Sequence, residues 1–148
     1  MLSYSHQNID ESDINAVISA LKDDILTGGD KVETFEKALC DYVGVNGACA
    51  LNSATSALHL AYLALNVAGK IVLTTPLTFV ATANAALMAG ARVEFIDIKS
   101  DGNIDENKLE ARLAKNSKDI GCICVVDYAG NSVEMDIILN LAQKYQIP

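Results

Sequence analysis

Small and hydroxyl-bearing residues open a predicted helix in the run Asn52-Ser53-Ala54-Thr55-Ser56-Ala57. The start of a helix presents free backbone N–H groups and the positive end of the helix dipole, and both favour a bound anion. Small side chains there let a phosphate approach the backbone closely. The same run also suits plain capping by Ser53 with close helix packing, so the spacing leaves a phosphate site and a structural turn equally open.

Two further turns follow predicted strands and carry side chains that could contact a ligand. The segment from Thr74 to Thr82 is rich in threonine, and Phe79 stands where the next helix begins. An aromatic face there could stack on a flat ligand, although composition alone favours an ordinary core position for Phe79. Asp127 and Tyr128 follow a later strand. They could hydrogen-bond a ligand, or Tyr128 could cover the core.

The elements that position these turns follow from hydrophobic periodicity. Helices are predicted over 14–22, 32–43, 54–65, 79–88, 105–113 and 133–145, and strands over 48–51, 71–74, 93–98 and 120–126. The alternation predicts parallel strands joined by right-handed crossovers, and the continuous apolar runs predict helices on both faces of the sheet. We expect a three-layer α/β/α fold with a mostly parallel sheet. In such folds, ligands bind at the carboxyl ends of the strands.

The composition excludes several classes of protein. The chain has 148 residues, 51% of them hydrophobic and 20% charged, with a net charge of −8. A chain this apolar is not disordered, and because Lys and Arg form no stripe we expect no nucleic-acid partner. No apolar run is long enough for a membrane span. Because the start of the sequence is polar and acidic, we expect no secretory leader and a reducing, cytoplasmic setting.

Several familiar chemical motifs are missing from the sequence. There is no Gly-x-Gly-x-x-Gly after the first predicted strand and no Gly-Lys-Ser/Thr loop, which argues against a dinucleotide fold and excludes a P-loop. We expect His6 and His59 to be surface and helix-face groups. Cys122 and Cys124 lie within one predicted strand, and their thiols are expected on opposite faces. No metal site is therefore predicted.

The end of the chain, Gln146-Ile147-Pro148, resembles the lead-in to another strand. Together with the high apolar content, it indicates a fragment or a chain that buries more surface against a partner. We expect self-association, because a truncated sheet exposes an edge and apolar helix faces.

Three segments resemble the DegT/DnrJ/StrS family of sugar aminotransferases, which are fold-type-I enzymes dependent on pyridoxal phosphate (PLP). These segments are 52–58, 74–84 and 127–130, and the resemblance extends over essentially the whole chain, including 26–29 and 101–105. It implies that residues 47–148 are the first portion of the PLP-binding large domain. Residues 1–46 would then form an N-terminal helical arm.

The resemblance also implies roles for particular residues. Ala54, Thr55 and Ser56 match the cradle for the cofactor phosphate, and Phe79 matches the aromatic ring that stacks on the pyridine. Asp127 stands where the family often has His. The residues near the nucleotide-sugar site, often across the dimer interface, are Tyr4, His6, Thr27 and Gly28.

Within the family, the sequence most resembles members that act in pseudaminic-acid synthesis. These transfer an amino group from glutamate to the C4 keto group of a UDP-linked 6-deoxy-N-acetylhexosamine and work as homodimers. The family's Schiff-base Lys, and the Asp that pairs with the pyridine nitrogen, are expected beyond Pro148. We therefore expect no catalytic residue in this chain and no activity from it alone.

Three alternatives remain open. One is a sugar dehydratase of the same family, in which His replaces the Schiff-base Lys. The others are a non-catalytic α/β module that binds a phosphate ester and a purely structural fragment that dimerises through its apolar surface.

Overall fold

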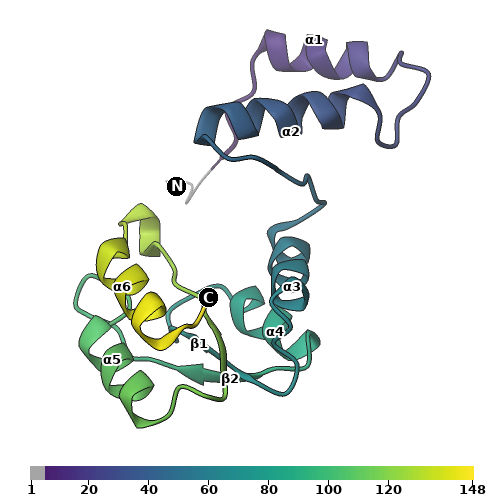
Figure 1. The fold of residues 1–148 in the computed structure, drawn as a ribbon. Helices are drawn as coiled ribbons and strands as arrows, with labels where there is room; N and C mark the ends of the chain where they lie inside the picture. The colour runs from purple at the N-terminus through teal and green to yellow at the C-terminus, as the bar shows by residue number, and fades with distance from the viewer. Residues whose placement is uncertain (1–5) are drawn as a thin grey trace. The chain divides into compact units, whose positions relative to one another are not determined.

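The computed structural model describes residues 6–148. It divides into two compact units, Met1–Ala50 and Leu51–Pro148, and each is described here by itself (Figure 1). None of the helices in residues 6–148 combines the length and the apolar character that crossing a membrane requires.

The unit Met1–Ala50 contains two helices, α1 (Glu11–Ala20) and α2 (Asp30–Val43). α1 begins three residues before the predicted start, because Asp10 is the cap. Its carboxylate accepts the N–H groups of Ser12 and Asp13 at 2.8 and 3.2 Å, and Asp13 accepts the N–H of Asp10 in return. α2 ends at Gly44 in the left-handed conformation, as the sequence predicted.

The predicted strand over 48–51 is wrong, because these residues are not in a strand. A strand exists only where its backbone bonds to a neighbouring strand. The N–H of Ala50 instead donates to the Glu36 carboxylate at 2.7 Å.

The unit Leu51–Pro148 alternates helices and strands. In chain order these are α3 (Ala54–Ala64), β1 (Ile71–Thr74), α4 (Ala81–Met88), β2 (Arg92–Phe95), α5 (Glu106–Lys115), β3 (Ile120–Ile123), the 3-10 turn η1 (Tyr128–Gly130) and α6 (Met135–Tyr145). The sheet has the order β2-β1-β3, and both strand pairs are parallel. The predicted parallel α/β fold is confirmed.

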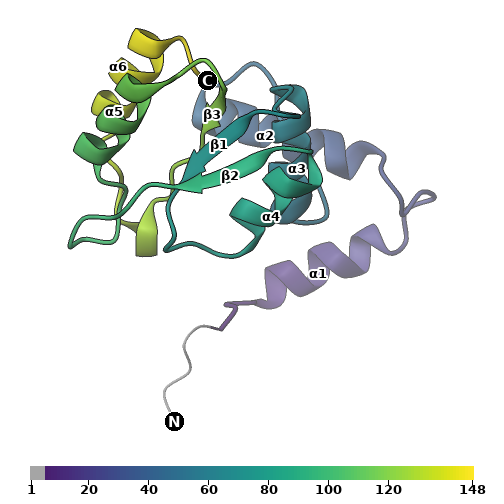
Figure 2. The same ribbon diagram turned by 90° about the horizontal axis from the view of Figure 1, so that it is seen from below.

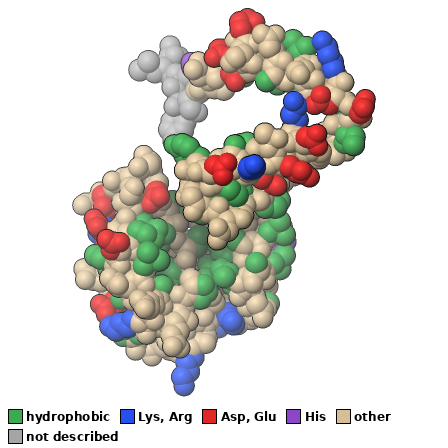
Figure 3. All heavy atoms as spheres, turned by 45° about the horizontal axis from the view of Figure 1, so that its top comes forward, with side chains coloured by type: hydrophobic (Ala, Val, Ile, Leu, Met, Phe, Trp, Pro, Cys, Tyr) green, Lys and Arg blue, Asp and Glu red, His purple; other side chains and the backbone are tan. Residues whose placement is uncertain are grey.

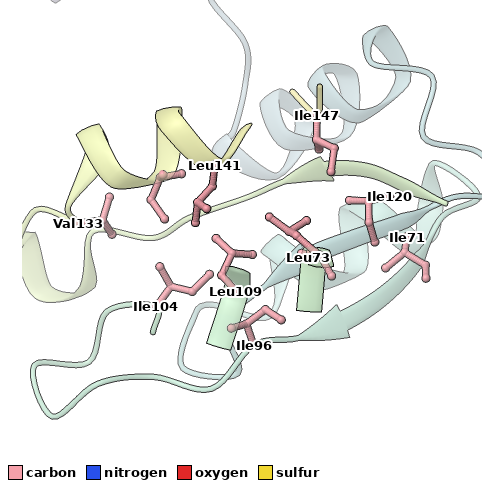
Figure 4. Packing of buried hydrophobic residues seen from close by; sticks show 11 residues of the cluster. Ile71, Leu73, Ile96, Ile104, Leu109, Ile120, Val133, Leu141 and Ile147 are labelled. Atoms are coloured by element: carbon pink, nitrogen blue, oxygen red, sulfur yellow. The ribbon is translucent and has the colours of Figure 1, made fainter. Parts of the chain in front are cut away.

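Helices cover both faces of this sheet. In Figure 2, β1 and β2 lie between α5 and α6 on one side and α3 and α4 on the other. Side chains alternate along β1: Leu73 packs in the cluster under α5 and α6, and Val72 packs in the cluster under α3 and α4. The first cluster consists of large aliphatic residues that point toward one another (Figure 4). The expected three layers are therefore present.

β2 and β3 are shorter than predicted, because their central partner β1 ends at Thr74. One further backbone bond continues on each side. The N–H of Ile96 donates to the Thr74 carbonyl at 2.7 Å, and the N–H of Cys124 donates to the Leu73 carbonyl at 2.8 Å. Beyond these points the chain leaves the sheet, and the carboxyl-end edge becomes available to a ligand.

The expectation that Cys122 and Cys124 face opposite sides of the sheet is wrong. Side chains two positions apart in a strand share a face, and both cysteines pack in the cluster under α3 and α4. Among residues 6–148, no group of three or more His, Cys, Asp or Glu side chains could hold a metal ion.

Candidate functional site

A pocket of about 360 Å³ opens at the carboxyl-end edge of the sheet, where α3 and α4 begin. Three segments line it. α3 contributes Ala54, Thr55 and Leu58; the start of α4 and the turn before it contribute Thr78, Phe79, Ala81 and Thr82; the chain after β3 contributes Cys124, Val125 and Val126. None of these residues is charged. Polar contacts in the pocket therefore come from hydroxyl groups, the Cys124 thiol and backbone groups.

The first turn of α3 leaves backbone donors at this pocket. The Ser53 hydroxyl caps the helix by accepting the N–H of Ser56 at 3.2 Å, and the Ser56 hydroxyl donates to the Asn52 side chain at 2.7 Å. The N–H groups of Ala54 and Thr55 have no partner inside the helix, as is general for the first turn. Both residues line the pocket, so this helix start can receive an anion.

Phe79 lies on the wall of the pocket and is 76% exposed. It therefore does not occupy the core position that composition alone favoured. The neighbouring hydroxyls of Thr78 and Thr82 hydrogen-bond to each other at 2.8 Å. An exposed ring beside a polar helix start suits a ligand that has both a flat ring and an anionic group.

The loop that follows the pocket-lining residues 124–126 is held by hydrogen bonds within the loop and to Asn103. The Asp127 carboxylate accepts the N–H of Val133 at 2.9 Å. The buried Asn103 side chain accepts the N–H of Tyr128 at 3.0 Å and donates to the carbonyls of Asn131 and Ser132 at 3.0 and 3.1 Å. In this structure Asp127 therefore shapes the loop.

The structure brings three of the eight predicted site residues together around one pocket: Ala54, Thr55 and Phe79. Ser56 lies beside them in the first turn of α3, but it does not line the pocket. His6, Thr27 and Gly28 belong to the unit Met1–Ala50. Tyr4 lies outside the described residues.

The loop between α1 and α2 encloses a hollow of about 540 Å³, whose walls include Gly28. Asp23, Asp24 and Asp30 also line it, and Lys31 pairs with Asp23 at 3.8 Å. The space-filling view shows acidic side chains (red) outnumbering Lys and Arg (blue) over this unit (Figure 3). The hollow is therefore more acidic than the pocket beside α3.

Sequence reasoning missed the third wall of the pocket, formed by Cys124, Val125 and Val126. These residues were predicted as the end of a strand. The rule that ligands bind beyond the carboxyl ends of parallel strands applies to them as well. It would have found them if the end of the strand had been placed at Ile123.

The fold and the pocket define a three-layer α/β domain with a ligand site at the carboxyl ends of its strands. The sequence profile of the DegT/DnrJ/EryC1/StrS aminotransferase family matches residues 7–148. The chain belongs to this family.

Individual relatives agree with this assignment. The chain is 75% identical, over all of its length, to a UDP-4-amino-4,6-dideoxy-N-acetyl-beta-L-altrosamine transaminase from Campylobacter jejuni, and it spans 39% of that relative. The structure of Helicobacter pylori PseC, an aminotransferase of pseudaminic-acid biosynthesis, matches 98% of the chain at 40% identity with a TM-score of 0.87, and the match covers 39% of PseC. The PLP-form of the putative sugar aminotransferase Spr1654 from Streptococcus pneumoniae matches 97% of the chain at 28% identity with a TM-score of 0.89, and the match covers 36% of Spr1654.

Proposed function

We propose that this chain is the N-terminal part of a PLP-dependent aminotransferase. The reaction is amino transfer from glutamate to the C4 keto group of a UDP-linked 6-deoxy-N-acetylhexosamine in pseudaminic-acid synthesis. The main support is the 75% identity to the Campylobacter jejuni relative, which is named as a transaminase of UDP-4-amino-4,6-dideoxy-N-acetyl-beta-L-altrosamine. This name also favours amino transfer over dehydration. A homodimer and a cytoplasmic setting remain predictions from the sequence.

The residues of the pocket fit PLP. The cofactor combines an aromatic ring with a phosphate ester. The pocket combines the exposed Phe79 ring with the free amides of Ala54 and Thr55. Small side chains at these positions leave the helix start accessible, and a volume of about 360 Å³ is within the range of small-molecule sites.

We assign the following roles to the residues of this chain. Ala54 and Thr55 hold the phosphate through their free backbone N–H groups and the Thr55 hydroxyl at the positive end of α3, and Phe79 orients the ring by stacking. Ser56 joins them by exchanging the hydrogen bond that its hydroxyl donates to Asn52 for one to the phosphate. When bound, PLP supplies the electron sink for amino transfer. Among residues 6–148, no lysine lines the pocket, and we propose that the chain binds PLP without turnover because this lining offers no Schiff-base residue.

We also propose that the nucleotide sugar is contacted by Tyr4, His6, Thr27 and Gly28. The support is the family resemblance of the loop between α1 and α2 and of the segment before α1. Gly28 has a φ of +80°, which a residue with a side chain rarely adopts, so a substitution there would strain the loop.

Titration of the chain with PLP, followed by absorbance and fluorescence, tests the cofactor site. We expect saturable binding. Thr55→Val removes a hydroxyl that can donate to an anion and should weaken binding about tenfold or more. Phe79→Ala removes the stacking face and should weaken it about three- to tenfold.

Two matched variants control for nonspecific effects. Thr34→Val makes the same exchange in α2, and Phe95→Ala removes a half-exposed ring from β2. Both should leave PLP binding unchanged. Absence of saturable binding, or binding that Thr55→Val and Phe79→Ala leave intact, contradicts the proposed site.

Turnover is tested by mixing the chain with glutamate, PLP and the UDP-linked keto sugar and measuring 2-oxoglutarate. We expect none from the chain alone, because its pocket lacks a lysine. Catalytic release of 2-oxoglutarate would overturn the proposal that the chain alone is inactive.

A further inference from the structure

The side chain of Tyr62 joins α3 to α4 below the pocket. It is 3% exposed, and its hydroxyl donates to the Thr82 carbonyl at 3.0 Å. Tyr62 lies two turns along α3 from Thr55, and Thr82 lies in the first turn of α4. Thr55 and Thr82 both line the pocket. One buried hydrogen bond therefore links the two helices whose starts form the pocket.

The other contacts between these helices are weakly directional. α4 presents small buried side chains, Ala85 and Ala86, toward the cluster that it shares with α3. Apolar packing of this kind stabilises close approach but does not specify a register as a hydrogen bond does. Burial, followed by the neighbouring Cys124 side chain, raises the pKa of the Tyr62 phenol well above its usual value. The phenol thus stays protonated and donates throughout the neutral range.

We infer that Tyr62 is a positioning residue that fixes the distance between the start of α3 and the turn carrying Phe79. This inference rests on the proposed function, in which the first element holds a phosphate and the second a ring. PLP spans both elements, so its affinity depends on their spacing. Inorganic phosphate needs only the start of α3. Comparing the affinities for PLP and for phosphate therefore distinguishes a positioning role of Tyr62 from a general effect on stability.

Tyr62→Phe is a clean test of this role. It keeps the buried ring and removes only the hydroxyl. The Thr82 carbonyl lies within α4 and can still accept the helical N–H of Ala86, so the substitution does not leave this carbonyl without a partner. Ile138→Val is the control, because it removes one buried methylene from α6 on the opposite face of the sheet.

The experiment measures the affinities of wild type and both variants for PLP and for inorganic phosphate, together with the induced circular dichroism of bound PLP. We expect Tyr62→Phe to bind PLP about three- to tenfold more weakly, with a smaller induced dichroism and unchanged phosphate affinity. Ile138→Val should match wild type in PLP affinity, phosphate affinity and induced dichroism.

The outcomes separate this inference from the proposed function. If wild type binds no PLP, the proposed function fails, and the role of Tyr62 toward PLP fails with it. If wild type binds PLP and Tyr62→Phe binds it equally well, only the inference is overturned. An equal loss for PLP and for phosphate also overturns it, because that pattern reflects general loosening of the fold.

Discussion

The two faces of the central sheet are built differently. Under α5 and α6 the cluster consists of large aliphatic side chains, among them Leu73, Leu109 and Leu113, each at most 1% exposed. Under α3 and α4 the cluster consists mostly of small side chains, among them Ala85, Ala86 and Cys122, packed around the large ring of Tyr62. The pocket lies beside the starts of α3 and α4, the two helices that cover the second face.

Because of this difference, we expect one face of the sheet to contribute mainly to stability and the other mainly to ligand binding. Large aliphatic residues bury the most apolar area, so the face under α5 and α6 carries the greater share of the hydrophobic stabilisation. Small residues bury less, but they let α3 and α4 lie close together with their positive ends at one pocket. Substitutions on the two faces should therefore have different consequences.

The largest effect is expected from Leu109→Ala on the face under α5 and α6. Leu109 is fully buried, and such a truncation leaves a cavity that costs about 2–5 kcal/mol. Chemical denaturation should show this loss in the free energy of unfolding. PLP affinity, measured under conditions where the variant is folded, should remain at the wild-type value. A weakened affinity in the folded variant would show that the two faces are not independent.

A smaller effect on stability is expected from Ala86→Leu on the face under α3 and α4. Ala86 is also fully buried, and overpacking a close contact costs about 1–3 kcal/mol. Unlike Leu109→Ala, this variant should also lose PLP affinity, because the larger side chain displaces α4 and with it the turn that carries Phe79.

Leu87→Ala provides the control for this overpacked variant. Leu87 is the next residue of α4 and is 54% exposed, so its truncation should change stability by no more than about 0.5 kcal/mol. If Ala86→Leu keeps full PLP affinity while Leu87→Ala loses it, PLP affinity does not depend on the packing of α4 against α3 as we expect.

Most of this arrangement was predictable from local sequence patterns. Hydrophobic periodicity gave the order of helices and strands from Ala54 to Tyr145, and the small residues at Ala54 and Thr55 marked the helix start that lines the pocket. The strand predicted over 48–51 failed because a strand depends on a partner that periodicity does not reveal.

The contacts that hold the site in shape had no such local signal. Tyr62 and Thr82 are twenty positions apart, and Asn103 binds a loop that begins 25 positions later. Such hydrogen bonds depend on how whole helices and strands pack together. Tyr62 and Asn103 therefore did not stand out among the other tyrosines and asparagines of the sequence. They became recognisable only as buried polar groups with partners.

The smallest effect on stability is expected from Phe79→Ala, which should change binding and leave folding unaffected. Phe79 is 76% exposed, so without ligand its removal should change the free energy of unfolding by less than about 0.5 kcal/mol. With PLP at a hundred times the wild-type Kd, wild type should gain about 2.7 kcal/mol from binding, and a variant that binds tenfold more weakly should gain about 1.4 kcal/mol. Denaturation with and without PLP measures both values. A large loss of unfolding free energy in Phe79→Ala without ligand would show that Phe79 belongs to the core. If PLP stabilised the variant as much as wild type, Phe79 would not be part of the binding site.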